Sequence, residues 1–288
     1  MIHVICNPAA GNGRARKTGD RIAQALREKN VPFSVTYTAA PGHATVLARD
    51  AANGGASTVL SVGGDGTAFE VARGLMGTSC ALGVIPAGTG NDFIKTIGLP
   101  REPMAALNYI LAHPAKETDV GEINGNLFLN EIGTGFDVSV LDYAEKAKKH
   151  CQGLMPYLYG VVRTLFRFHS IPLTYAVDGD SPVTTDAFVM AAANGGVIGG
   201  GIRIAPDAKA DDGLLDIVIV EKIPGRKLIF RLIELMRGKI MSFPETKFFR
   251  ASAVTFSAPG LRVNVDGEII PCAQVSARVL PGALLIHR

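Results

Sequence analysis

The chain lacks the usual marks of a membrane-spanning, zinc-binding or nucleic-acid-binding protein. It has four cysteines in 288 residues, Cys6, Cys80, Cys151 and Cys272, and their spacing fits neither a CxxC pair nor a zinc site. It contains no run of about 18 apolar residues, so no transmembrane helix is expected. The net charge is only +3, and no basic stripe or motif indicates a nucleic-acid partner.

The first residues, MIHVICNP, also lack the basic segment and long apolar stretch of a secretory signal peptide. Cys6 and Cys80 lie beside or within short apolar runs, which is typical of reduced core thiols. These features predict a cytoplasmic protein. The pI of about 8.7 is compatible with peripheral contact with an anionic membrane surface.

The features that are present indicate a globular chain long enough for two domains. Hydrophobic residues make up 47% of the sequence, which is enough for a core in each half and argues against disorder. Charged residues make up only 19%, and there are 33 glycines. This combination favours many tight turns, and loops that meet a ligand through their backbone.

The first third of the chain alternates short apolar strands with amphipathic helices. This alternation predicts an α/β domain with a parallel sheet covered on both sides. Strands are expected at residues 2–6, 33–37, 58–62 and 81–85, and helices at residues 15–29, 43–52, 67–75 and 103–112.

The pattern changes near residue 120, after which extended segments dominate. Many strands separated by Gly/Pro turns predict a mainly antiparallel β-sandwich or barrel-like domain. Two helical interruptions are expected, at about 139–169 and 226–241. We therefore assign residues 1–122 to an α/β domain and residues 123–288 to a β-rich domain. The strands are expected at residues 127–131, 173–177, 187–193, 214–220, 253–257, 261–265 and 274–279.

Three glycine-rich loops follow strands of the first domain, at residues 7–13, 63–67 and 86–92. Ligands of parallel sheets bind outside the carboxyl ends of the strands. Glycine lets backbone N–H groups approach phosphate oxygens, and each loop leads into a helix, whose first N–H groups favour an anion. One such loop is as often only a tight turn, but three at successive strand ends indicate a phosphate site.

The loops are not the commoner nucleotide motifs. No GxxxxGK[ST] is present, and neither are the HRD and DFG motifs of protein kinases. Gly11-Asn12-Gly13 begins like a dinucleotide fingerprint, but Arg16 stands where that fingerprint needs glycine.

The segments GGDGT (63–67) and PAGTGNDF (86–93) resemble the diacylglycerol kinase catalytic-domain family, which includes bacterial soluble diacylglycerol kinases, sphingosine kinases and ceramide kinases. GGDGT is shared with NAD kinases, whereas PxGTGNDF is much narrower. The likeness extends to NPAAGNGRA (7–15), TAAPGHA (38–44) and two motifs of the second half.

The resemblance implies an NAD kinase/diacylglycerol kinase-like fold with ATP in a cleft between the two domains. In it Asp65 would hold Mg²⁺ or its waters. The family usually has Asn where this chain has Phe69, just before the retained Glu70. The nucleotide-binding residues that the resemblance implies are Asn7, Thr38, Gly63, Gly64, Asp65, Gly66, Thr67, Glu70, Gly88, Thr89, Gly90, Asn91 and Asp92.

Two acidic motifs of the second half complete the resemblance. Residues 206–216 contain four acids, which by themselves are more typical of a solvated turn than of a hard-cation site. The resemblance implies that Asp212 binds Mg²⁺ through its side chain, and Lys209 and Leu214 through their backbone carbonyls. In DGE (266–268), it implies that Asp266 is the general base and that Glu268 assists it. A positioned base contributes about 10²–10⁴ in rate.

The resemblance therefore predicts an ATP-dependent lipid kinase that phosphorylates a lipid hydroxyl, with diacylglycerol the favoured acceptor. A soluble small-molecule kinase such as an NAD kinase and a non-catalytic nucleotide or lipid sensor stay open as alternatives. No motif selects among lipid acceptors, and a homodimer stays open as well.

A lipid acceptor requires work at a bilayer surface, and two stretches are candidates for docking. Residues 146–169 mix five basic residues (Lys146, Lys148, Lys149, Arg163 and Arg167) with Leu165, Phe166 and Phe168. Residues 226–240 are expected to form an amphipathic helix with Leu228, Ile229, Leu232, Leu235 and Met236 on one face and Arg231 and Arg237 opposite. Packing of both faces on the core is the competing interpretation.

Overall fold

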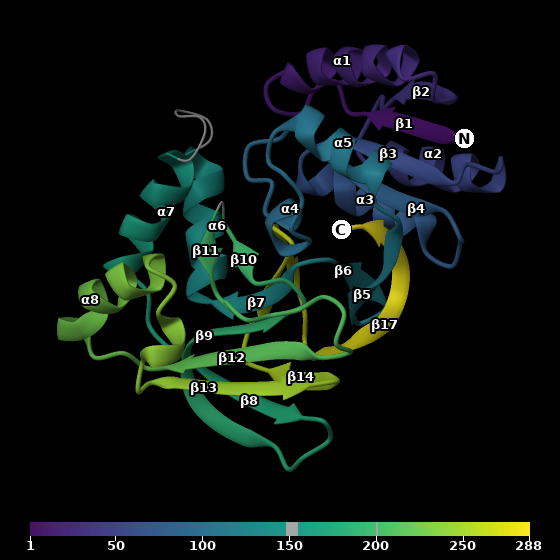
Figure 1. Ribbon diagram of the computed structural model, residues 1–288. Coiled ribbons are helices and arrows are strands. Elements are labelled where there is room, and N and C mark those ends of the chain that lie inside the picture. Colours follow the sequence, from purple (N-terminus) through teal and green to yellow (C-terminus); the bar gives the residue numbers. More distant parts are fainter. Residues whose placement is uncertain (148–154, 200) are drawn as a thin grey trace. The chain divides into compact units, whose positions relative to one another are not determined.

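The computed structural model describes residues 1–147, 155–199 and 201–288 (Figure 1). Cys151, Lys148 and Lys149, named above, lie outside the described residues, as does the side chain of Met236. The chain divides into two compact units. The first comprises Met1–Val120 and Pro281–Arg288, and the second comprises Gly121–Leu280.

The first unit contains a parallel sheet, as predicted. Its strands β1 (Ile2–Cys6), β2 (Phe33–Tyr37), β3 (Thr58–Gly63) and β4 (Ala81–Pro86) lie in the order β2-β1-β3-β4. Every residue of β3 and β4 is buried, which explains why both strands are mainly apolar in sequence. The carboxyl ends of β1, β3 and β4 share one edge, where the three glycine loops begin.

Helices cover both faces of this sheet. α1 (Arg14–Glu28) contacts α5 (Pro103–Ala112), while α2 (His43–Asn53) contacts α3 (Asp65–Leu75). A single turn of helix, α4 (Phe93–Thr96), follows the third glycine loop. The two pairs lie on opposite faces, which is the two-sided α/β arrangement expected from the alternating sequence pattern.

The last eight residues belong to the first unit, whereas the sequence pattern assigned all of 123–288 to the second domain. They are the end of the long strand β17 (Val275–His287), in which Ile286 pairs in parallel with Leu82 of β4. The carboxylate of Asp119 accepts the Gly282 N–H at 2.8 Å. Because β17 continues from the second unit into the first, the amino-acid composition does not change at residue 281, and the sequence gives no sign of the boundary there.

The second unit is an antiparallel β-sandwich, as predicted. Most of its strands follow the order β16-β15-β7-β9-β8-β14-β17, and β12 pairs with β9 and β13. Short strands β10 (Val197–Ile198) and β11 (Ile202–Arg203) form a separate hairpin, and β5 (Ala115–Ile123) and β6 (Asn126–Phe128) pair at the start of the unit. The sandwich strands are β7 (Glu131–Gly135), β8 (Ile171–Val177), β9 (Val183–Ala193), β12 (Leu215–Glu221), β13 (Thr246–Ala251), β14 (Ala253–Ser257), β15 (Arg262–Val265) and β16 (Glu268–Pro271).

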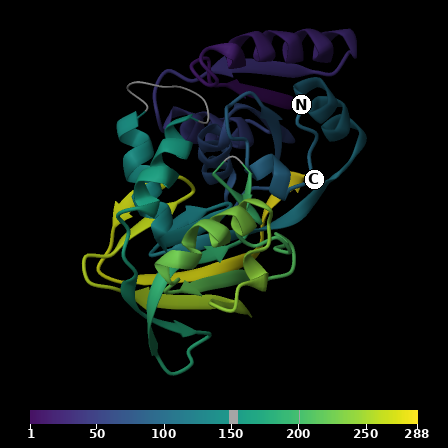
Figure 2. The same cartoon turned by 90° about the vertical axis from the view of Figure 1, so that its left-hand side faces the viewer.

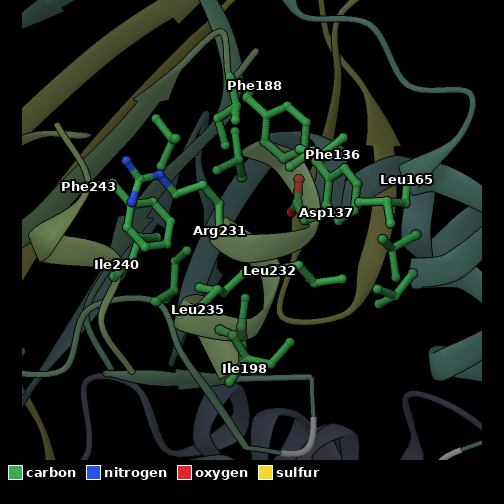
Figure 3. A pocket seen from close by; sticks show the side chains of 18 of the residues that line it. Phe136, Asp137, Leu165, Phe188, Ile198, Arg231, Leu232, Leu235, Ile240 and Phe243 are labelled. Atoms are coloured by element: carbon green, nitrogen blue, oxygen red, sulfur yellow. The ribbon is translucent and has the colours of Figure 1, made fainter. Parts of the chain in front are cut away.

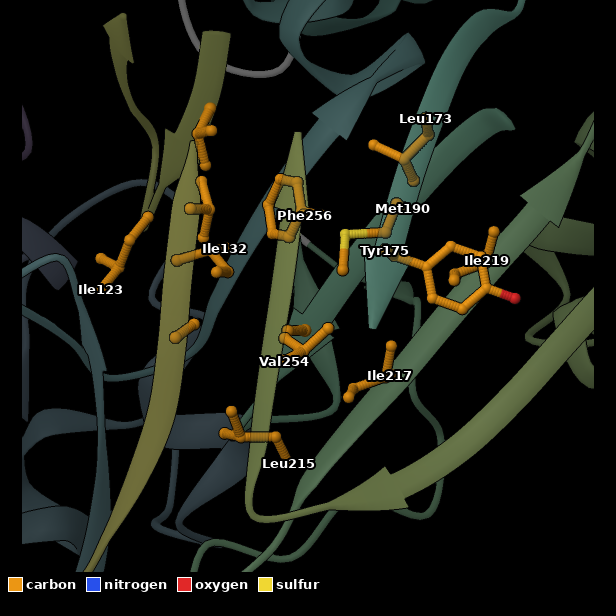
Figure 4. Packing of buried hydrophobic residues seen from close by; sticks show 14 of the residues in the cluster. Ile123, Ile132, Leu173, Tyr175, Met190, Leu215, Ile217, Ile219, Val254 and Phe256 are labelled. Atoms are coloured by element: carbon orange, nitrogen blue, oxygen red, sulfur yellow. The ribbon is translucent and has the colours of Figure 1, made fainter. Parts of the chain in front are cut away.

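Strand β12 is buried on both faces and separates two apolar clusters. Ile217 and Ile219 face the sandwich core, which is drawn in Figure 4 with Phe256 and Met190. Their neighbour Val218 faces the other way, into a smaller cluster under helix α8. Because side chains alternate along a strand, burial of both faces gives β12 a continuous apolar run at residues 217–220.

Three helices lie on the sandwich: α6 (Phe136–Ala147), α7 (Met155–Leu165) and α8 (Gly225–Met236), the last followed by a short 3₁₀ turn at Ile240–Ser242. α6 and α7 pack closely against each other, and Figures 1 and 2 both show them as a pair beside α8. Leu232 of α8 and Val161 of α7 share one apolar cluster, so the helices enclose common space.

Candidate functional site

The three glycine loops of the first unit surround a cavity of about 540 Å³, which is within the range of small-ligand sites. The loop after β2 completes its wall. The cavity is lined by Asn7, Pro8, Ala9, Ala10, Gly11, Thr38, Ala39, Ala40, Pro41, Gly64, Gly66, Thr67, Glu70, Gly88 and Thr89. Eight of the residues predicted to bind nucleotide are among them: Asn7, Thr38, Gly64, Gly66, Thr67, Glu70, Gly88 and Thr89.

Glycine is required where the loops approach one another. A Cβ at Gly88 would overlap the Cα of Gly64, so the second and third loops meet through their backbones. A Cβ at Gly11, whose φ is +59°, would overlap the carbonyl oxygen of Ala87. The floor of the cavity is therefore made of main chain, and N–H groups can reach a ligand without a side chain between them.

The first turn of α3 faces this loop cluster. The helix begins at Asp65, and within the described residues no side chain caps its amino end. Its first N–H groups have no partner inside the helix, and the helix dipole adds positive potential there. The Asn7 amide donates to the hydroxyl of Thr67 at 3.1 Å, which ties the first loop to this turn. The arrangement suits an anionic group such as a phosphate.

Glu70 fixes the loop after β2. Its two carboxylate oxygens accept the N–H groups of Gly42 at 2.8 Å and Ala44 at 3.1 Å, at the amino end of α2. The Thr45 hydroxyl donates to the Glu70 carbonyl at 2.9 Å. Glu70 thus lines the cavity and also holds the TAAPGHA segment against α3. Phe69, the departure from the family pattern, is half-buried and is not one of the cavity-lining residues that the structure describes.

Asp65, Asn91 and Asp92 shape the third loop rather than line the cavity. The carboxylate of Asp65 accepts the Phe93 N–H at 3.0 Å, and burial raises its pKa. Asn91, at φ 48°, closes the loop on Gly88 with two hydrogen bonds of 3.1 Å. Asp92 pairs with Lys95 at 2.6 Å. Gly63 and Gly90, also predicted to bind nucleotide, likewise lie in the loops but not in the lining.

Asp266 occupies a tight turn between β15 and β16. Asp266 and Gly267 both have positive φ, 47° and 98°, as in two-residue hairpin turns. The Asp266 carboxylate accepts three consecutive backbone N–H groups, of Leu129 at 2.5 Å and of Asn130 and Glu131 at 2.9 Å each. Glu268, two residues on, is exposed. Asp266 therefore anchors the segment before β7, in addition to any catalytic role.

A buried polar chain leads from this turn into the sandwich. The side-chain amide oxygen of Asn264 accepts the Gly267 N–H at 2.8 Å. Its amide donates to two carboxylates, Glu131 and Asp137, at 3.3 Å each. Burial raises the pKa of Asp137 to about 6, against the hydrogen bonds from the Val138 N–H and from Asn264. Asn264 thus connects the DGE turn to a carboxyl group deep in the unit.

Asp137 is one of the residues that line an apolar pocket formed by α6, α7, α8 and the sheet, where it lies between Phe136 and Arg231 (Figure 3). Apolar side chains such as Phe188, Leu232 and Phe243 form most of its wall. Arg231 is the other charged residue of the lining, and it pairs with Glu234 at 2.7 Å and Glu245 at 3.1 Å. The enclosed volume is about 60 Å³.

The inward position of Arg231 corrects the predicted pattern of α8. The sequence placed Arg231 on the polar face and Ile229 on the apolar face, whereas Arg231 lines the pocket and Ile229 is 54% exposed. The reason is Glu245, which neutralises the guanidinium from outside the helix. Leu228, Leu232 and Leu235 line the pocket as the amphipathic pattern predicted.

Among the residues predicted to bind magnesium, Asp212 lies next to the positively charged side chain of Arg250. Asp212 forms an ion pair with Arg250, whose guanidinium also contacts the buried Asp216 at 3.2 Å. The other Asp212 oxygen accepts the Leu214 N–H at 3.1 Å, and Lys209 lies in an adjoining cavity. Within the described residues, no group of three or more His, Cys, Asp or Glu side chains could hold a metal. The predicted site has one carboxylate and two backbone carbonyls, so this absence does not bear on it, and the Mg²⁺ assignment stays a prediction.

Sequence reasoning missed Glu131, Asp137 and Asn264. A signal existed for Asp137, because it is an acid at the start of a helix within the otherwise apolar run IGTGFDVSV. No signal existed for Asn264, whose partners lie 133 and 127 positions away in the chain.

Two family models match nearly the whole chain. The diacylglycerol kinase catalytic domain matches residues 1–123, and the YegS C-terminal NAD kinase beta sandwich-like domain matches residues 130–288. Among the described residues, no helix is long and apolar enough to cross a membrane.

Relatives with these names align along most of the chain. A "Diacylglycerol kinase" of Mycobacterium tuberculosis is 30% identical over all of this chain and 94% of its own length. A "Probable lipid kinase YegS-like" protein of Chromohalobacter salexigens is 33% identical over 91% of this chain and 85% of its own. The crystal structure of a diacylglycerol kinase from Bacillus anthracis is similar with a TM-score of 0.80 and 27% identity, covering 99% of this chain and 96% of that one.

Proposed function

The chain belongs to the family of diacylglycerol kinases and YegS-like lipid kinases, and on that premise we propose that it transfers the γ-phosphate of ATP to the free hydroxyl of diacylglycerol, giving phosphatidic acid. The observation that carries the choice of a lipid acceptor is the apolar pocket of the second unit, with one carboxyl group in its lining. A polar, soluble acceptor such as NAD would not gain affinity from a pocket lined by Phe, Leu, Ile and Val side chains.

The nucleotide phosphates are bound by the cavity of the first unit. Its glycine loops offer backbone N–H groups, and the amino end of α3 adds a positive potential that does not need a lysine. MgATP enters as the substrate, so its metal ion arrives with the nucleotide. Phosphoryl transfer needs alignment and charge neutralisation above all, and a cavity made of fixed backbone donors supplies both.

The acceptor is bound by the second unit. In the apolar pocket one acyl chain lies among Phe188, Leu232 and Phe243, and the polar head contacts Asp137. The enclosed volume of about 60 Å³ is small, so side chains on α7 and α8 move aside as the chain enters. Asp266 keeps the role of general base that the family resemblance implies, and Asn264 links its turn to Asp137.

The test is ATP-dependent phosphorylation of a panel of lipids in mixed micelles, with NAD as a soluble control. We expect label on diacylglycerol. Label on another lipid would keep the lipid-kinase reaction and replace the acceptor, whereas label on NAD alone would refute a lipid acceptor. Absence of label on every compound would favour a nucleotide or lipid sensor.

A pocket variant tests the acceptor site directly. Leu232→Trp fills the pocket from α8, so we expect the KM for diacylglycerol to rise at least tenfold while the KM for ATP stays unchanged. An unchanged KM for diacylglycerol would place the acyl chain elsewhere.

A further inference from the structure

Exposed apolar side chains gather on two helices of the second unit. Among the described residues twelve large apolar side chains are exposed, and eight of these lie on α7, on α8 or directly after α7. Both helices also line the apolar pocket with their opposite faces. Each is therefore apolar on the inside and on the outside, which a helix packed against a single core does not require.

The exposed face of α7 is one continuous stripe. Met155, Leu158, Tyr159 and Val162 are each between 45% and 59% exposed, and Phe166 just after the helix is 76% exposed. Their spacing of three and four residues places them on one side of the helix. The opposite side, with Gly160 and Val161, is buried.

α8 presents a second stripe, made of Ile229, Phe230 and Ile233, which are 54%, 69% and 43% exposed. Arg226 and Arg237, both exposed, lie three residues before Ile229 and four residues after Ile233. The apolar side chains are thus bracketed by positive charge along the helix.

The charge around these stripes selects the partner. Residues 155–169 and 222–239 together hold eight basic residues and one acidic residue, Glu234, although the whole chain has a net charge of only +3. The rest of the chain is therefore net negative. Glu245 pairs with two of the eight, Lys227 and Arg231, which leaves six basic residues. A second copy of this chain would bring like charges together, whereas an anionic bilayer offers both an apolar interior and negative head groups.

We propose that the outer faces of α7 and α8 insert into the head-group region of an anionic lipid bilayer. Aromatic and aliphatic side chains enter the acyl boundary, and Arg167, Arg226 and Arg237 contact the anionic head groups. Continuity with the pocket supports this placement, because the same two helices that meet the bilayer also wall the apolar space behind them. The role of this surface in catalysis rests on the proposed lipid-kinase function. Its binding to vesicles can be measured whether or not the chain is a lipid kinase.

The absence of tryptophan from the chain makes a direct test possible. Phe166→Trp places a single fluorophore on the exposed stripe, and Val183→Trp places one on β9, where the side chain is 45% exposed. With vesicles of phosphatidylcholine and phosphatidylglycerol, we expect a blue shift and quenching by brominated acyl chains for Phe166→Trp alone. Equal responses of both variants, or none from either, would overturn the proposal.

Vesicle affinity is the second measurement. Phe166→Ser with Phe230→Ser should weaken sedimentation with anionic vesicles at least tenfold, and Arg226→Gln with Arg237→Gln should weaken it about tenfold and reduce its salt dependence. The matched control, Val46→Ser with Val183→Ser, removes exposed apolar side chains elsewhere and should bind like the wild type. A wild type that ignores anionic vesicles, or a Phe166/Phe230 variant that binds normally, would contradict the proposal. So would a wild-type dimer that this variant dissociates while vesicle binding is unchanged.

Turnover separates this proposal from the proposed function. Neither Phe166 nor Phe230 lines the pocket, so the double variant should keep turnover on dissolved dihexanoylglycerol and lose turnover on diacylglycerol in vesicles. Equal turnover on vesicles by variant and wild type would count against the docking surface. If the wild type phosphorylates no lipid at all, the kinase proposal fails, while the fluorescence and sedimentation results still decide the surface.

Discussion

Asp266→Asn should destabilise the second unit as well as slow catalysis. The carboxylate accepts the N–H groups of Leu129, Asn130 and Glu131, which fixes the entry to β7. Asparagine is close in shape and tolerates the positive φ of this turn, so backbone strain does not change. What changes is that one carboxylate oxygen becomes an NH₂ group that faces a backbone donor.

The magnitude follows from the hydrogen bonds lost. One bond to a charged acceptor contributes about 1.5–3 kcal/mol, and leaving its donor unpaired adds to this cost. The remaining two bonds persist but are weakened, because the acceptor is now neutral. We expect a decrease of about 2–4 kcal/mol in the free energy of unfolding of the second unit.

Urea unfolding followed by circular dichroism measures the decrease, and amide hydrogen exchange at residues 129–131 locates it. At a typical slope of about 2 kcal/mol per molar urea, the midpoint should fall by about 1–2 M. The matched control is Glu268→Gln, since Glu268 is exposed in the same turn and should shift stability by less than about 0.5 kcal/mol. An Asp266→Asn variant with wild-type midpoint and wild-type exchange would refute the anchoring role, whatever its activity.

Three further predictions follow from the site residues. Burial raises the pKa of Asp137 to about 6, so between about pH 4 and pH 6 the native chain keeps a proton that the unfolded chain has lost. The free energy of unfolding should therefore fall by about 3 kcal/mol as the pH rises through this range. The pH-dependent unfolding of Asp137→Asn should lack that part of the slope. Gly88→Ala should force its loop away from Gly64 and lower the affinity for ATP, measured by calorimetry, more than tenfold. Gly66→Ala adds a Cβ that meets nothing within 4 Å, so this variant should keep the wild-type melting temperature. Glu70→Gln should cost about 1–2 kcal/mol and speed exchange in the first turn of α2; exchange at the wild-type rate would show that this carboxylate does not hold the helix.

Most helices and strands of the first unit were predicted from the sequence, although α4, β5 and the end of β17 were not. Strands at 2–6 and 33–37 and the helix at 103–112 have the expected bounds. Buried parallel strands have to be short apolar runs, and the glycine loops end them sharply, so local pattern and tertiary role agree. The same agreement led to the prediction of a ligand site at the glycine loops, where the structure has a cavity.

The second unit was predicted in class but not in its polar interior. β14 has the expected bounds, whereas β7, β10, β11, β13 and β16 were missed. β10 and β11 have only two residues each, and β13 and β16 have at most one fully buried residue each to mark them. Asp137, Glu131 and Asn264 meet only in the folded chain. A buried carboxyl group is recognised by its neighbours, and those neighbours lie on strands more than 100 residues away.

The cavity of the glycine loops and the apolar pocket of the second unit are lined by different kinds of groups, and this difference suggests how the acceptor can be identified. The phosphate cavity consists largely of backbone and small side chains, so relatives at about 30% identity can share it through a few glycines. The apolar pocket consists of large side chains on α6, α7, α8 and the sheet, each of which can be exchanged without harm to the loops. If the proposed function holds, acceptor choice depends on residues such as Phe188, Leu232 and Phe243 together with Asp137. Exchanging these side chains between two relatives should carry the acceptor preference with them and leave the KM for ATP in place.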